Sequence, residues 1–163
     1  MPVPDFLEFV LVRGCGITYN TTVKPRVVFD TNVLVAGLRS RRGAAFRLLA
    51  LAGTGAFEHC LSVGLLFEYE SALKRPGVVP KLNHRQLDAI LDYLCASAFR
   101  QEIHYLWRPV LRDPGDDLVL EVAVAGECES IVTYNLRDFA GSERFGIRVQ
   151  TPREFLAEME EGQ

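Results

Sequence analysis

The first candidate for chemistry is an aspartate that follows a run of apolar residues. Asp30 comes directly after residues 27–29, Val-Val-Phe, which have the composition of a buried parallel strand. Burying a carboxylate costs free energy unless a cation or hydrogen-bond donors offset its charge. The position of Asp30 therefore needs an explanation, and a site that offsets its charge with a cation or hydrogen-bond donors would supply one.

Two more groups of polar side chains follow or begin apolar segments further along the chain. Asp116 and Asp117 lie in the first turn of a predicted helix that is apolar on almost every side. Thr133, Asn135 and Asp138 come at and after the end of the apolar strand pattern SIVTY. In an open parallel sheet, ligands bind outside the carboxyl ends of the strands. We therefore expect these side chains at one edge of the sheet, beside the first aspartate.

Two glutamates compete for the interior face of a further predicted helix. Glu70 stands four residues before Lys74, a spacing typical of an exposed ion pair. Glu68 instead shares a face with Leu65 and Ala72, at i−3 and i+4. Glu68 is therefore the interior candidate.

Alternating strand and helix patterns are expected to position these side chains. The expected strands cover residues 27–29, 57–61, 102–108, 130–134 and 147–150. The expected helices cover residues 44–53, 63–75, 84–99, 114–125 and 151–161. Strands separated by helices predict an α/β fold with a parallel sheet covered on both faces.

Helix caps support several of these boundaries. Ser62 is a predicted N-cap, and residues 83–86, Asn-His-Arg-Gln, have the form of a capping box. Asp113 followed by Pro114 predicts an N-cap with proline at the first helical position. Asp113 is therefore expected to cap its helix and not to bind a ligand.

Size and composition indicate one ordinary globular domain. The chain has 163 residues, of which 48% are hydrophobic and 24% charged, enough for one buried core. We expect residues 1–25 to be an N-terminal extension, either loosely ordered or an edge strand followed by a polar turn, and residues 26–163 to be the domain. No membrane span or convincing secretory signal is found in the sequence. The four cysteines show neither zinc-ligand nor disulfide spacing, so reduced thiols and a cytoplasmic location are expected.

Net charge limits how a polyanion could bind. The formal charge of −3 gives no attraction of the whole molecule to nucleic acid, so RNA would need a local basic patch or bound cations. Arginines in the turn RSRRG and cations near two helix ends could supply such a patch, because guanidinium groups bind phosphate in a bidentate way. These candidates for RNA contact are Arg39, Arg41, Arg42, Arg47, Lys74 and Arg75.

Four stretches, taken together and in order, resemble the PIN-domain family. They are VVFDTNVLVAG, LSVGLLFEYESALKRPG, DPGDDLVLEVAVAGECESIVTYNLRDF and IRVQTPREFL, within about residues 26–157. The resemblance is strongest to the branch of VapBC-like toxins of toxin–antitoxin systems. It implies a three-layer α/β/α sandwich with a central, mostly parallel sheet. It also implies an endoribonuclease that depends on Mg²⁺ or Mn²⁺, acts on RNA, dimerises and is silenced by a cognate antitoxin protein.

The resemblance also implies which acids form the site. The first acid is Asp30 of FDTN and the second is Glu68 of FEYESAL. The third is Asp116 of GDDLVLEVA, with its neighbour Asp117 as the alternative. Together they would hold one or two metal ions.

The fourth position of the site is open between two residues. Asn135 occupies a place where the family often has an acid or an asparagine, and Asp138 occupies a second place where it has an acid. If Asn135 is the ligand, the site has one negative charge fewer and holds a second ion more weakly. Thr133 is expected to orient a ligand from behind the site.

Three other functions compete with the nuclease. A phosphatase of the haloacid dehalogenase kind would need an Asp-x-Asp motif, whereas residues 30–32 are Asp-Thr-Asn. A receiver-like signalling domain would need an early acidic pair and a late lysine, which are not evident. The remaining alternative is a catalytically weak or inactive PIN-like domain that binds RNA or protein, a reading that Asn135 favours.

Overall fold

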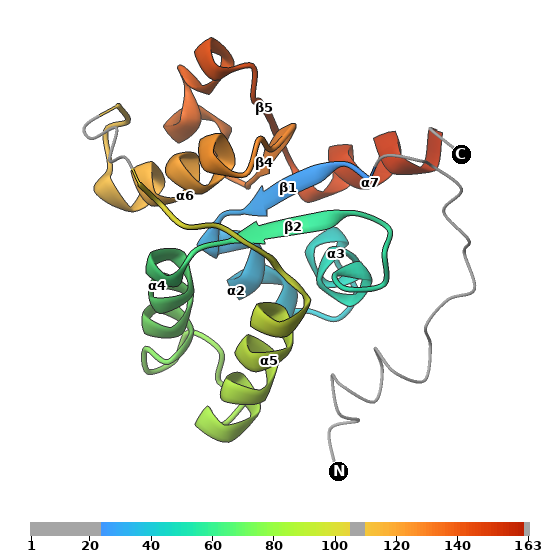
Figure 1. Cartoon of the computed structure of the whole chain (residues 1–163). Helices are drawn as coiled ribbons and strands as arrows, with labels where there is room; N and C mark the ends of the chain where they lie inside the picture. Colours follow the sequence, from blue (N-terminus) through green and yellow to red (C-terminus); the bar gives the residue numbers. More distant parts are fainter. Residues whose placement is uncertain (1–23, 105–109, 162–163) are drawn as a thin grey trace.

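The chain folds around a five-stranded, entirely parallel sheet (Figure 1). The structure is a computed structural model and describes residues 24–104 and 110–161. The spatial order of the strands is β3-β2-β1-β4-β5. Their bounds are β1 Arg26–Phe29, β2 Glu58–Leu61, β3 Phe99–Arg100, β4 Ser130–Val132 and β5 Arg148–Gln150.

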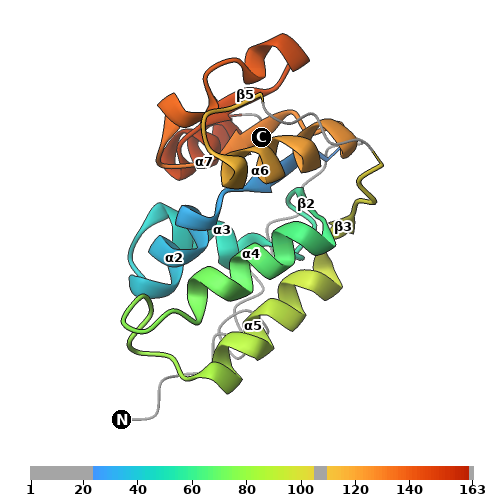
Figure 2. The same cartoon turned by 90° about the vertical axis from the view of Figure 1, so that its left-hand side faces the viewer.

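Helices connect the strands and cover both faces of the sheet. They are α2 Thr31–Arg39, α3 Ala44–Leu51, α4 Val63–Leu73, α5 His84–Ser97, α6 Pro114–Ala125 and α7 Pro152–Glu161, with 3₁₀ turns η1 Leu136–Phe139 and η2 Ser142–Phe145. Figure 1 shows α6 on one side of the sheet and α2 and α3 on the other. Helix α7 packs on α3, and Figure 2 shows α4 and α5 side by side. The predicted three-layer α/β/α sandwich is confirmed.

The central strand is the most apolar part of the sheet. Val27 and Val28 of β1 are fully buried, and Phe29 is 2% exposed. A strand with neighbours on both sides and helices on both faces must be apolar along its whole length, which explains the continuous hydrophobic run.

The order of the strands creates a switch point at this central strand. The chain leaves β1 through α2 and α3 toward β2, and it leaves β4 through η1 and η2 toward β5. The two connections therefore run in opposite directions and leave a crevice between the carboxyl ends of β1 and β4.

The predicted helix caps are present. The Ser62 hydroxyl accepts a hydrogen bond from the Leu65 backbone N–H at 3.2 Å. Asn83 and Gln86 form the reciprocal capping box, and the Asp113 carboxylate accepts from the Gly115 N–H at 2.7 Å, with proline following the cap. These local hydrogen bonds set the starts of α4, α5 and α6.

Two elements differ from the sequence-based expectation. Helix α2 was not expected, although its buried residues Val33, Leu34, Gly37 and Leu38 follow a helical period. The strand expected at residues 102–108 is wrong for residues 102–104, because the edge strand β3 is Phe99–Arg100, where the helix was expected to continue. Beyond Leu61 the chain of β2 turns into α4, so no backbone remains to pair with residues 102–104. Residues 105–108 lie outside the described part of the chain.

Two further expectations concern the N-terminal extension and the absence of a membrane-spanning segment. The N-terminal extension lies almost wholly outside the described residues, so the predicted division at residue 25 stays a prediction. Within residues 24–104 and 110–161, no helix has the length and apolar character to cross a bilayer.

One histidine of the sheet has its side chain buried in the core. His59 of β2 is 4% exposed, its ring stacks on Phe29, and its Nε2 lies 2.9 Å from the backbone oxygen of Leu94. Because a carbonyl can only accept, Nε2 carries the proton. Nδ1 has no hydrogen-bond partner among the described residues. Burial lowers the pKa of His59, so the ring is held neutral.

This histidine should make stability depend on pH. The unfolded chain binds a proton at His59 near pH 6.5 while the folded chain does not, so the free energy of unfolding should fall as pH drops below that value. The contribution is at most about 1.4 kcal/mol per pH unit. Urea unfolding of the wild type and of His59→Gln between pH 5 and 7.5 measures it. Equal pH slopes in the two proteins would contradict this assignment.

Candidate active site

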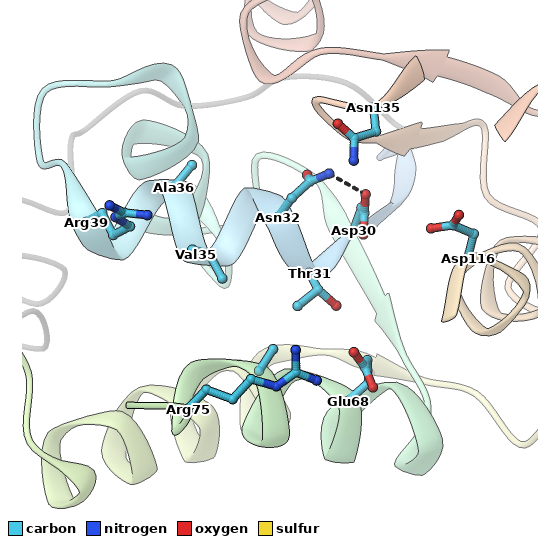
Figure 3. Close-up of a pocket in the computed structure, with 11 residues that line it drawn as sticks. Asp30, Thr31, Asn32, Val35, Ala36, Arg39, Glu68, Arg75, Asp116 and Asn135 are labelled. Carbon is cyan, nitrogen blue, oxygen red and sulfur yellow. Dashed lines mark hydrogen bonds between the residues drawn. The ribbon is translucent and has the colours of Figure 1, made fainter. Parts of the chain in front are cut away.

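A cavity opens at the carboxyl end of the central strand (Figure 3). Its volume is about 560 Å³. The polar residues that line it come from four separate segments of the chain: Asp30, Thr31, Asn32, Arg39, Glu68, Arg75, Asp116 and Asn135. Three of them are carboxylates expected at the site, and Asn135 is one of the two candidates for the fourth position.

Asp30 is the most buried of these acids. Its backbone N–H donates to Val132 at 3.0 Å, which continues the pairing of β1 with β4 by one residue. It occupies the N-cap position of α2, yet its side chain makes no capping hydrogen bond. Instead Oδ2 accepts from the Thr133 hydroxyl and from Nδ2 of Asn32, each at 2.6 Å. The carboxylate is therefore turned toward β4 and the cavity.

Burial and hydrogen bonding act in opposite directions on this carboxylate. Burial raises the pKa of Asp30, and the negative charge of Asp138 raises it further. The hydrogen bond from Thr133 and the backbone N–H groups at the start of α2 lower it, but they do not cancel the effect of burial. A nearby cation would favour the charged form.

Glu68 reaches the cavity because α4 is held against the end of β1. The hydroxyl of its neighbour Tyr69 is fully buried and donates to the backbone oxygen of Phe29. Leu65 and Ala72, which share the face of Glu68, are buried as the helical spacing predicts. Glu70 forms the expected pair with Lys74 at 2.6 Å on the outer face.

Asp116 enters the cavity from the start of α6. Since Asp113 caps this helix, the carboxylate of Asp116 is not needed for capping. Figure 3 shows it on a different side of the cavity from Glu68, with its carboxylate turned toward Asp30. Burial, followed by repulsion from Asp30 and other carboxylates, raises the pKa of Asp116 to about 6.

The neighbouring Asp117 has a different environment. It is 2% exposed, and its Oδ1 accepts hydrogen bonds from the backbone N–H groups of Val110 and Leu111, at 3.3 and 2.9 Å. Asp117 does not line the cavity. Its carboxylate holds the segment that leads into α6.

The two candidates for the fourth position lie at and within η1: Asn135 directly precedes it, and Asp138 is part of it. Asn135 lines the cavity, and its backbone N–H donates to the Thr133 hydroxyl oxygen at 2.9 Å. Asp138 is exposed and does not line the cavity. Its charge nevertheless raises the pKa of both Asp30 and Asp116, so it contributes to the negative potential there.

Comparison with family models decides the family. The model described as PIN domain matches residues 26–137, more than half of the chain and including every acid of the cavity. The chain belongs to the PIN-domain family. Comparison with curated protein sequences gave no match.

A solved structure supports the fold of this PIN domain. The chain is similar to a chain in the crystal structure of VapBC2 from Rickettsia felis bound to a DNA fragment from their promoter. The TM-score is 0.53, the sequence identity is 15%, and the match covers 77% of this chain and 98% of that chain. At this identity the likeness shows the fold alone.

The basic residues near the PIN-domain cavity fall into two groups. Arg39, at the end of α2, and Arg75, just after α4, line the cavity. Arg47 instead pairs with Glu160 at 2.8 Å, and Lys74 pairs with Asp88 as well as with its helix neighbour. Arg41 and Arg42 are exposed in the turn after α2 and do not line the cavity.

The donor set suits a hard divalent cation. Carboxylate and amide oxygens are ligands that Mg²⁺ and Mn²⁺ prefer. No three acidic, histidine or cysteine side chains of residues 24–104 and 110–161 already form a closed coordination group. Mg²⁺ usually keeps several waters and binds only one or two carboxylates directly, so an open arrangement of acids fits it.

Sequence reasoning missed two polar residues that line this PIN-domain cavity, Thr31 and Asn32. Asn32 lines the cavity and bonds to Asp30. A polar residue two positions after the first aspartate, directly before the apolar residues 33–38, was the available signal for Asn32.

The two adjacent aspartates should respond differently to substitution. Asp117→Ala leaves two backbone donors without their acceptor and should lower the free energy of unfolding by about 1–3 kcal/mol. Asp116→Asn removes a repelled charge and should cause no loss of stability in the absence of divalent ions. Urea unfolding at pH 7 with a chelator measures both. An equal loss of stability in the two variants would refute the different roles.

Proposed function

We propose that this PIN domain is an endoribonuclease that depends on divalent metal ions and hydrolyses RNA phosphodiester bonds. One observation carries the proposal. Asp30, Glu68 and Asp116, from three distant segments, line the same cavity at the switch point of the sheet. Mutual repulsion among such acids is tolerable in a folded protein when a cation neutralises them.

The proposed ion ligands are those that face the cavity. Asp30, Glu68 and Asp116 would hold one or two Mg²⁺ or Mn²⁺ ions, with Asn135 as the fourth ligand and Asp138 adding negative charge from the rim. A bound ion would activate a water molecule and stabilise the leaving oxygen in phosphodiester hydrolysis. Asp116 is a better candidate than Asp117, because the latter carboxylate is occupied by backbone donors.

Two arginines are suited to bind the substrate. Arg39 and Arg75 line the same cavity as the acids, from the ends of two different helices. We propose that they bind phosphate groups of RNA on either side of the cleaved bond, since guanidinium groups bind phosphate oxygens in pairs. Their charge offsets the repulsion between the acids and the RNA backbone.

We also propose that this chain is the toxin of a toxin–antitoxin pair, a role that its family membership and fold support. The similar fold from Rickettsia felis belongs to a VapBC2 complex. We propose that this chain likewise binds a cognate antitoxin protein, encoded beside it, and that it forms a homodimer.

The nuclease proposal predicts loss of cleavage without loss of folding in Asp30→Asn. The substitution keeps the shape of the side chain and removes the charge nearest the ion. RNA cleavage in Mg²⁺ or Mn²⁺ should fall to background, with an unchanged circular dichroism spectrum. Asp92→Asn, the same change on the exposed face of α5, is the matched control and should keep full activity.

This experiment also separates the enzyme from a binding domain. If the wild type binds RNA but neither metal ion supports cleavage, the chain is an RNA-binding PIN domain and not a nuclease. If Asp30→Asn cleaves as fast as the wild type, the site lies elsewhere.

The dimer proposal rests on an apolar surface of α4. Val63 and Phe67 lie one turn apart and are 70% and 63% exposed. We expect a mass of two chains in solution at micromolar concentration, measured by light scattering, and a shift toward one chain in Phe67→Glu. A monomeric wild type at this concentration would contradict the proposal.

A further inference from the structure

The carboxamide of Asn32 connects three parts of the site. Nδ2 lies 2.6 Å from Oδ2 of Asp30 and 3.2 Å from the Thr133 hydroxyl oxygen. Oδ1 lies 3.2 Å from the backbone nitrogen of Tyr134. One side chain at the start of α2 therefore contacts the first aspartate, the end of β4 and the segment that leads to Asn135. Figure 3 shows the bond to Asp30.

The direction of each hydrogen bond is determined by the backbone. The N–H of Tyr134 can only donate, so the atom of Asn32 that faces it must be the oxygen. The amide NH₂ then faces Asp30 and donates to its carboxylate. The Thr133 hydroxyl donates its proton to the same carboxylate oxygen and accepts from Asn32 and from the Asn135 N–H, so its hydrogen-bonding capacity is complete.

The two carboxylate oxygens of Asp30 differ in their side-chain hydrogen-bond donors. Oδ2 accepts from two side chains, Asn32 and Thr133, at the same short distance of 2.6 Å. Such hydrogen bonds hold the carboxylate in one orientation and leave Oδ1 as the oxygen without these side-chain donors. A carboxylate that offers one oxygen suits the octahedral shell of Mg²⁺ or Mn²⁺, whereas larger ions also accept both oxygens at once.

We propose that Asn32 is a positioning residue of the ion site, an inference that rests on the proposed function. It holds Asp30 in the orientation that presents a single oxygen to the cation. Through Tyr134 it also fixes the segment that carries Asn135, so the first and fourth ligands are positioned together.

The test is Mn²⁺ binding by Asn32→Ala, measured by electron paramagnetic resonance of the free ion without any substrate. We expect an affinity about 10–100-fold below that of the wild type, the usual effect of removing a group that orients a metal ligand. Asn83→Ala is the matched control, because it removes the same side chain from the capping box of α5, far along the chain from the cavity. It should lower stability and leave Mn²⁺ affinity unchanged.

A second measurement needs no metal ion. Hydrogen exchange of the Tyr134 amide should be faster in Asn32→Ala than in the wild type, because its acceptor is gone, and unchanged in Asn83→Ala. If Asn32→Ala does not fold, Asn32→Leu, which keeps the branched shape without the polar atoms, replaces it in both measurements.

The possible outcomes separate this inference from the proposed function. If the wild type binds Mn²⁺ and Asn32→Ala binds it equally well, the positioning role is overturned while the ion site stands. If the wild type binds no Mn²⁺, the proposed function falls and the positioning role falls with it. Unchanged exchange at Tyr134 overturns the link to the Asn135 segment.

Discussion

The structure of this site depends on one energetically unfavourable feature, the burial of the Asp30 carboxylate at the end of the central strand. The residue is 7% exposed and follows three apolar residues that cannot move without breaking the sheet. The neighbouring groups partly offset the free-energy cost of this burial. Thr133 and Asn32 donate to one oxygen, and the first backbone N–H groups of α2 face the charge. These groups reduce the penalty without removing it, so a nearby cation would still stabilise the charged form.

Strand register explains why residues so far apart in sequence meet here. Phe29 of β1 pairs with Val132 of β4, so the next residues on the two strands, Asp30 and Thr133, emerge side by side. The same parallel arrangement places the start of α4 after β2 at this edge. A shift of one residue in the β1–β4 register would turn Thr133 away from the carboxylate, because successive side chains of a strand point to opposite faces.

The cavity combines two charge requirements that oppose each other. Acids crowd one part of it, and burial together with their mutual repulsion raises the pKa of Asp116. Arg39 and Arg75 line the same cavity, while Arg47 and Lys74 are engaged in ion pairs with acidic side chains. A polyanion with bound divalent ions would neutralise both groups, because the ions face the acids and the anionic groups face the arginines. With a net charge of −3, attraction of such a ligand has to be local.

Much of the fold could be predicted from the sequence because local physics specifies it. The apolar run before Asp30, the caps at Ser62, Asn83 and Asp113, and the i, i+4 spacing around Glu68 each depend on residues close together in the chain. The family follows from the order of such local motifs. The edge strand could not be placed in this way, because its position depends on where β2 ends.

The choice between chemically equivalent neighbours was a matter of tertiary structure. Asp116 and Asp117 are both acids in the first turn of α6, and only their surroundings differ: one faces the cavity, and the other accepts from the Val110 and Leu111 N–H groups. The role of Asn32 likewise appears only when β4 lies beside β1 and supplies its partners. The sequence by itself determined which residue types and which strand ends could hold a cation. The tertiary structure decided which side chains reach the cavity, because that depends on contacts between residues about a hundred positions apart.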